Sequence, residues 1–340
     1  MKSIEKNIEK ITITVDYRSE LLGIIMWLSD YHNQFPHLFQ PYANKFFTDN
    51  IIQKFNEFKK EPAILEFNEL VKKHGFSYDA PISLFLQINE NFDCNDVNDY
   101  ILKERLHNDP SIFKFLEDTK AFAKKIYFEK YYQQNIPLYK EWISDFSKTF
   151  ENTKIIDFFT NYFGYQNNAK FYINLMPYTT EGAYGCYAKN KVYSCYPVFK
   201  NTKQENLFDT ANHEKIIIAT QVHEFAHNFI NPLTEKYKSI ILHENLFKKI
   251  KKQMKMQAYP SDEVIINEHI VRAIELRFLK MYYDDDEWIQ RRIKKLKDQG
   301  FIYIDIIIDS LKYYESHREK YPNLDFFYPQ IIKDIQKKSI

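Results

Sequence analysis

Glycine is scarce in this chain, with only 6 among 340 residues. The phosphate-binding loops of P-loop enzymes and of dinucleotide-binding enzymes each need several closely spaced glycines, and no such cluster occurs. The sequence therefore argues against a nucleotide-binding enzyme of either class. The low glycine content, together with abundant Lys, Ile, Tyr and Phe, also favours helices over a turn-rich β-sandwich.

An excess of charge of one sign is also lacking, as are long hydrophobic runs. The net charge is +1 at pH 7, so no overall field attracts nucleic acid or a membrane surface. No apolar stretch reaches the length of about 20 residues that spans a bilayer, so we expect no membrane span. Residues 1–6 lack the apolar segment of a signal peptide. We therefore expect a cytoplasmic protein, or a secreted one whose export signal has been removed.

Cysteine is also rare, with 3 residues, of which Cys94 is isolated. The other two lie in residues 182–199, whose pattern predicts a β-hairpin. A two-residue turn at Asn190–Lys191 would place Cys186 directly opposite Cys195 in a pair without ladder hydrogen bonds, where side chains approach closest. A cross-strand disulfide is then geometrically allowed, although a cytoplasmic protein would keep both thiols reduced.

What the sequence does contain is hydrophobic periodicity, and it predicts an α+β protein that is predominantly α-helical. Strands are expected at residues 10–17 and 169–178, before the hairpin at 182–199. Helices are expected at residues 18–32, 42–60, 62–73, 81–89, 111–133, 137–163, 233–257, 261–283, 287–298, 303–317 and 326–338.

Residues 223–227 have the form H-E-x-x-H. Their surroundings predict a helix that ends at Asn231–Pro232. Residues i and i+4 share one helix face, so His223 and His227 can bind one metal ion, with Glu224 beside it as a base. The helix is apolar nearly all the way round, which predicts that both imidazoles are buried and need a partner.

The third ligand must come from elsewhere, because a catalytic zinc usually takes three protein ligands and one water. Ile230 and Leu233 stand where a three-histidine zinc motif requires Gly and His, so that family is excluded. A helical wheel places Glu268 on an apolar face of the helix at residues 261–283. A carboxylate there is costly unless it is paired or coordinated, so Glu268 is the predicted third ligand.

Glu275 lies on the same face and is the alternative third ligand, or an acceptor for the outer nitrogen of a ligand imidazole. Arg272 can neutralise these carboxylates, or bind a substrate carboxylate or the developing oxyanion. The wheel places His269 on the polar side of the helix, away from the site.

These residues predict a zinc-dependent hydrolase, most of all a metallopeptidase that acts on a peptide or protein. Glu224 would activate a zinc-bound water for attack on the peptide carbonyl. The alternatives are a zinc-dependent amidase or other hydrolase, and a non-catalytic helical binding protein with a structural or vestigial zinc site. The donors expected for the oxyanion are Arg272 and the hairpin tyrosines Tyr184, Tyr187 and Tyr193.

Three segments, HEFAHNFINP, NEHIVRA and ITITVDYRSELLGIIMWLS, resemble the DUF4932 family, which is associated with zinc peptidases. The resemblance covers about residues 10–283. It implies a gluzincin-type site, with His223, His227 and Glu268 as ligands of Zn²⁺ and Glu224 as the base. Members of that family are often exported, whereas no export signal is visible here.

The resemblance also implies a zincin-like core, in which a small antiparallel sheet accompanies the H-E-x-x-H helix and the helix of the third ligand. The expected organisation has three parts. Residues 1–165 form a mainly helical N-terminal region, residues 166–290 the catalytic core, and residues 291–340 C-terminal helices that pack on the core.

Overall fold

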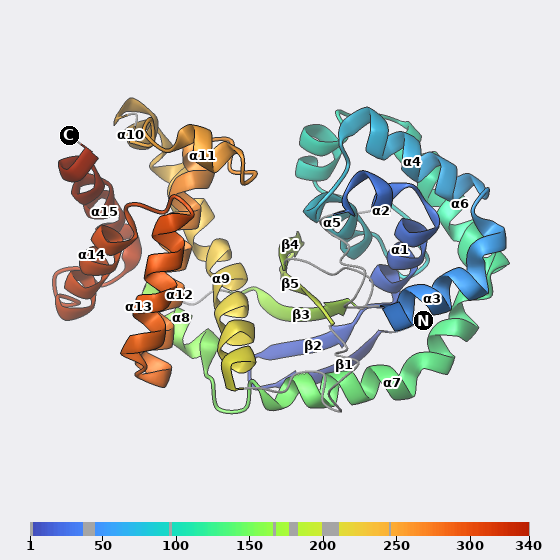
Figure 1. The fold of residues 1–340 in the computed structure, drawn as a ribbon, viewed down its shortest axis with the longest axis horizontal. Helices are drawn as coiled ribbons and strands as arrows, with labels where there is room; N and C mark the ends of the chain where they lie inside the picture. The colour runs from blue at the N-terminus through green and yellow to red at the C-terminus, as the bar shows by residue number, and fades with distance from the viewer. Residues whose placement is uncertain are drawn as a thin grey trace. The chain divides into compact units, whose positions relative to one another are not determined.

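The structure is a computed structural model and describes residues 3–36, 45–94, 97–165, 168–176, 183–198, 211–244 and 246–339. Helices predominate, and one small mixed sheet accompanies them, which confirms the predicted α+β class (Figure 1). No helix in the described ranges combines the length and the apolar character needed to cross a bilayer.

Contacts within the chain divide it into two compact units. The first comprises residues 1–151 and 169–214, and the second comprises residues 152–168 and 215–340. The strands at 169–198 therefore group with the N-terminal part of the chain. The three-part division at residues 165 and 290 stays a prediction.

The sheet of the first unit has the strand order β1-β2-β3-β5-β4. Its strands are β1 (Ile4–Ile8), β2 (Ile11–Val15), β3 (Lys170–Met176), β4 (Tyr184–Ala188) and β5 (Lys191–Pro197). The pairs β1–β2 and β4–β5 are antiparallel, whereas β2–β3 and β3–β5 are parallel. The expectation of an antiparallel sheet was wrong. The long connection between β2 and β3 places these strands parallel, and β5, which follows the edge strand β4, pairs parallel with β3.

The hairpin of β4 and β5 turns one residue earlier than predicted. Lys189 adopts φ +54°, and the turn occupies residues 189–190. This change alters every cross-strand pair, so Cys186 pairs with Tyr193 rather than with Cys195. The prediction that the two cysteines lie directly opposite each other was therefore wrong. Both are free thiols on diagonally adjacent positions, with their Sγ atoms 3.9 Å apart.

The helices of the first unit surround this sheet. They are α1 (Tyr17–Leu28), α2 (Tyr31–Gln34), α3 (Lys45–Phe55), α4 (Pro62–His74), α5 (Asp79–Gln87), α6 (Ser111–Lys125) and α7 (Phe128–Lys148), with short turns η2 (Asn56–Phe58) and η3 (Tyr100–Arg105). Helix α7 packs against β1 and β2, and α5 packs against β4. The predicted helix boundary near residues 133–137 was wrong. The break lies at Tyr127, with φ +52°, and Pro137 is inside α7.

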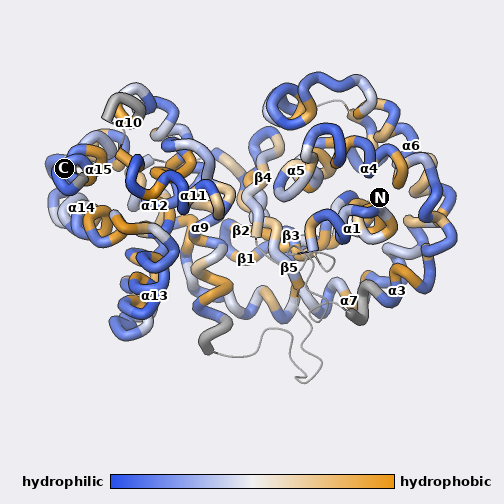
Figure 2. The backbone as a smooth tube through the Cα atoms, turned by 45° about the horizontal axis from the view of Figure 1, so that its top comes forward, coloured by the Kyte–Doolittle hydropathy of each residue, from blue (hydrophilic) through white to orange (hydrophobic). Residues whose placement is uncertain are grey.

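The second unit is entirely helical among the residues described. Its helices are α8 (Ile155–Phe163), α9 (Ala211–Lys236, which begins at the end of the first unit), α10 (Lys238–Glu244), α11 (Lys251–Lys255), α12 (Asp262–Tyr283), α13 (Asp286–Asp298), α14 (Ile304–Ser316) and α15 (Leu324–Ser339). Helix α12 contacts α10, α13 and α14, so it lies at the centre of this unit. Helix α13 is mostly hydrophilic (Figure 2).

Helix α9, which carries the H-E-x-x-H motif, differs from its prediction in two ways. It continues through Pro232 to Lys236, although a proline inside a helix removes one backbone hydrogen bond. It is also not buried on all sides. Ile216 is 47% exposed and Thr220 is half-buried, whereas Ile217 is fully buried. One side of α9 is therefore accessible.

Candidate metal centre

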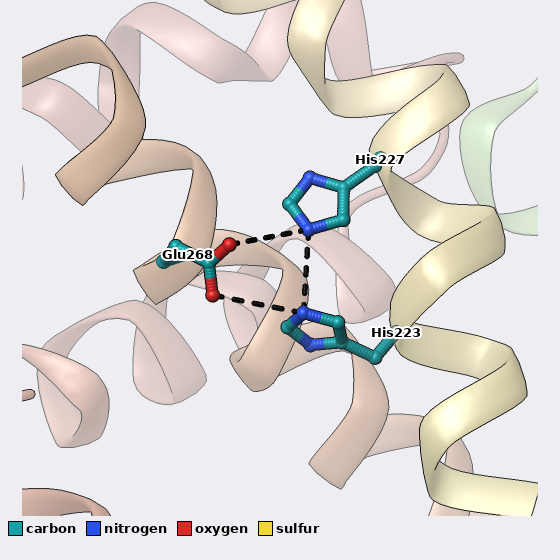
Figure 3. Close-up of side chains that lie close together, drawn as sticks. All are labelled: His223, His227 and Glu268. Atoms are coloured by element: carbon teal, nitrogen blue, oxygen red, sulfur yellow. Dashed lines mark hydrogen bonds and ion pairs between the residues drawn. The ribbon is translucent and has the colours of Figure 1, made fainter. Parts of the chain in front are cut away.

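Two helices of the second unit place the candidate ligands. His223 and His227 are one turn apart on α9, and Glu268 is in the second turn of α12. Helix α12 begins after Ser261, whose side-chain oxygen accepts a hydrogen bond from the backbone N–H of Val264. Figure 3 shows both imidazoles directed toward the Glu268 carboxylate.

The three side chains have the spacing of a metal site. The Nε2 atoms of His223 and His227 are 3.2 Å apart, and Glu268 Oε1 and Oε2 lie 3.4 Å and 3.6 Å from the Nε2 atoms of His227 and His223, respectively. Donors bound at about 2.0–2.1 Å to a tetrahedral zinc ion lie roughly 3.3 Å apart. The observed distances match that spacing. Within the described ranges, no other group of three or more His, Cys, Asp or Glu side chains could hold an ion.

The outer nitrogen of each imidazole faces a side-chain oxygen, within hydrogen-bond distance for His227 and at a longer distance for His223. Glu275 Oε2 lies 3.6 Å from His223 Nδ1, and Asn231 Oδ1 lies 3.1 Å from His227 Nδ1. Arg292 in turn donates a 3.1 Å hydrogen bond to Glu275 Oε1. Such partners fix ring orientation and the tautomer in which Nε2 is free to bind a metal. The sequence did not identify Asn231 in this role, because Asn231–Pro232 was interpreted as the end of the helix.

Arg272 links the Glu268 carboxylate to Tyr259 and Phe301. Its Nη2 atom donates 3.0 Å hydrogen bonds to Glu268 Oε2 and to the hydroxyl of Tyr259. The guanidinium also lies over the ring of Phe301, 4.7 Å from its centre. Glu268 and Glu275 therefore each have an arginine partner, which offsets the cost of burying two carboxylates side by side.

The charge state of Glu268 follows from these neighbours. Burial favours its neutral form, but the hydrogen bond with His227 and the charge of Arg272 outweigh burial and hold its pKa far below the usual range. For Glu275, burial is likewise outweighed by Arg292 and His223, so its pKa is lowered. Both carboxylates are therefore ionised at neutral pH, and Glu268 is the one that faces the two imidazoles.

The two histidines differ in protonation. Burial, together with the charge of Arg272, lowers the pKa of His223 and keeps its imidazole neutral. For His227, burial acts in the same direction but is outweighed by the hydrogen bond and charge of Glu268 and by the charge of Glu224, so its pKa is raised. A metal bound at this site would therefore displace a proton from His227.

Glu224 lies next to His223 on α9 and is half-buried. Its charge contributes to the raised pKa values of His227 and of the Tyr259 phenol. The accessible side of α9 contains Glu224, Thr220 and Ile216. A carboxylate in this place can exchange a proton with a water molecule at the three-ligand cluster.

His269 was predicted on a polar helix face, and this was wrong. It is fully buried, with its Nδ1 atom 2.8 Å from the carbonyl oxygen of Ile265 and its ring against Phe301 and Phe247. Burial lowers its pKa to about 4, so it is neutral. The wheel failed because α12 is packed by neighbours on nearly all sides.

Tyr259 is a further residue of this site that was not predicted from the sequence. It lies in the segment between α11 and α12, where no periodic pattern marks a side chain as facing the site. The tyrosines predicted as oxyanion donors, Tyr184, Tyr187 and Tyr193, lie on β4 and β5 of the other unit, and their role stays a prediction.

The fold and the three-donor cluster define a predominantly helical α+β protein with a candidate His-His-Glu metal site. Residues 11–334 match the family model of DUF4932, described as a domain of unknown function, and the chain belongs to that family. None of the curated proteins and none of the solved structures compared with the chain matches it.

Proposed function

We propose that this protein is a zinc-dependent hydrolase, and specifically a metallopeptidase of the gluzincin type, with the zincin-like pairing of an H-E-x-x-H helix and the helix of the third ligand. The observation that carries the proposal is the convergence of His223, His227 and Glu268, with Glu224 beside them on the helix of the two histidines. Two imidazoles and one carboxylate form a ligand set that catalytic zinc uses, and it leaves a coordination position for water. Purely structural zinc sites have four protein ligands, whereas three converge among the residues described.

When bound, zinc acts as a Lewis acid that lowers the pKa of its water and polarises a carbonyl group. Glu224 would accept the proton that the attacking water loses, and its carboxyl group would deliver that proton to the leaving amine nitrogen as the peptide C–N bond breaks. Asn231 orients His227 through its Nδ1 atom, and the Glu275 carboxylate faces Nδ1 of His223, so that both Nε2 atoms are directed toward Glu268.

The test uses Glu224→Gln, with Glu235→Gln as the matched control. Glu235 is on the same helix, and its side chain is 74% exposed. We expect one zinc per chain in all three proteins. Cleavage of a mixed peptide library should fall by about 10²–10⁴-fold in Glu224→Gln and stay unchanged in the control, because a general base contributes that factor.

Two results would contradict the proposal. Protein that contains no zinc after exposure to it would exclude the metal site. Zinc-loaded protein that cleaves no peptide but hydrolyses simple amides would assign the same residues to an amidase.

A further inference from the structure

Tyr259 is held firmly beside the metal-ligating cluster. Its backbone N–H donates a 3.0 Å hydrogen bond to the carbonyl oxygen of Met254, which fixes the segment between α11 and α12. Its ring packs edge-on against Phe301, with the ring centres 6.1 Å apart. Arg272 Nη2 lies 3.0 Å from its hydroxyl oxygen. The phenol is therefore fixed along its whole length before any ligand binds.

The hydroxyl hydrogen of Tyr259 has no acceptor among the residues that the structure describes. A guanidinium has donors and no acceptor, so in the contact with Arg272 the tyrosine oxygen accepts. The tyrosine's own O–H is left for another partner. A half-buried phenol can give this hydrogen bond to water or to a ligand oxygen. The unused donor is therefore available to a ligand oxygen.

The Tyr259 hydroxyl lies near the Glu268 carboxylate, because both accept a hydrogen bond from the same nitrogen of Arg272. Arg272 Nη2 also donates to Glu268 Oε2 at 3.0 Å, so the two oxygens are at most about 6 Å apart. Burial, Glu268 and Glu224 raise the pKa of Tyr259, so the phenol keeps its proton at neutral pH. The donor therefore lies within about 6 Å of a metal-ligating carboxylate.

We propose that Tyr259 is a catalytic residue that donates its O–H hydrogen bond to the oxyanion formed from the substrate carbonyl, with Arg272 as the residue that positions it. This inference rests on the proposed function. Attack by water breaks the carbonyl π bond and places its electron pair on oxygen, where the Tyr259 hydroxyl stabilises it. Tyr259 keeps its own proton throughout. The water proton passes to Glu224 and then to the leaving nitrogen.

The first test compares Tyr259→Phe with Tyr313→Phe, which removes a phenol from an exposed site on α14. Zinc content and thermal unfolding of the zinc-loaded protein should be unchanged in both. Tyr259→Phe should lower kcat for peptide cleavage by about 10²–10³-fold, the effect of losing one oxyanion donor, with little change in KM. Tyr313→Phe should leave both constants unchanged.

A second readout does not depend on turnover. Acetohydroxamate places an anionic oxygen at a zinc site, and calorimetry measures its affinity for the zinc-loaded protein. We expect the affinity to fall about tenfold in Tyr259→Phe, which loses one hydrogen bond to a charged group, and to be unchanged in Tyr313→Phe. Equal affinity in both variants would overturn the role of Tyr259.

Arg272→Lys tests the positioning role. At saturating zinc it should lower kcat in the wild-type background but not in the Tyr259→Phe background, because an effect exerted through Tyr259 disappears with the phenol. Equal losses in both backgrounds would show that Arg272 acts independently. A wild-type protein without zinc or peptidase activity would refute the proposed function. An active wild type with an equally active Tyr259→Phe would refute this inference alone.

Discussion

At the scale of single residues, each of the two buried carboxylates of the candidate site has charged or imidazole partners. Glu268 has Arg272 and the two imidazoles, and Glu275 has Arg292 and His223. A buried carboxylate without such partners would favour its protonated form. The arrangement therefore keeps the third donor ionised before a metal arrives.

The raised pKa of His227 leads to a prediction about pH. A protonated His227 cannot bind a metal, so apparent zinc affinity should fall as the pH decreases from 8 to 6. The same proton stabilises the metal-free fold through Glu268. That contribution is complete below the ordinary histidine pKa of about 6.5 and is lost as the pH rises through the raised value.

Calorimetric zinc titrations in two buffers with different enthalpies of ionisation measure the protons released. We expect proton release at pH 6.5 and below. Zinc affinity that does not change between pH 6 and pH 8 would contradict the assignment of His227 as a protonated ligand in the metal-free protein.

At the scale of secondary structure, the site depends on where α9 and α12 begin and how they face each other. The first turn of α12 is capped by Ser261, whose side chain accepts the Val264 N–H. Ser261→Ala should lower the free energy of unfolding by about 1 kcal/mol, because that N–H loses its acceptor. Urea unfolding of the metal-free protein measures the change, with Ser316→Ala near the C-terminal end of α14 as a control. An unchanged midpoint in Ser261→Ala would show that the cap contributes nothing.

The parts of the site that could be predicted from the sequence are those that depend on local spacing. The i, i+4 positions of His223 and His227 follow from helix geometry alone, and the apolar neighbours of Glu268 identified it from one helix. The register of the hairpin depended on the positive φ of Lys189, a residue without the usual preference for that conformation. The position of Tyr259 depends on the path of a non-helical segment, and no periodicity in the sequence predicts that path.

At the scale of the whole molecule, every residue of the candidate site belongs to one compact unit, residues 152–168 and 215–340. The geometry of the three donors is therefore determined within that unit. The five-stranded sheet lies in the other unit, with its mixed strand order. Membership of the DUF4932 family spans both units, since the match covers residues 11–334.

The central claim, a His-His-Glu zinc site, is tested most directly by a zinc titration of the wild-type chain and of Glu268→Ala, with Glu263→Ala as the control on the same helix. The wild type and the control should bind one zinc per chain with equal affinity. Glu268→Ala should bind zinc at least tenfold more weakly, because one of three ligands is lost. A wild-type chain that binds no zinc, or a Glu268→Ala variant with unchanged affinity, would contradict the account.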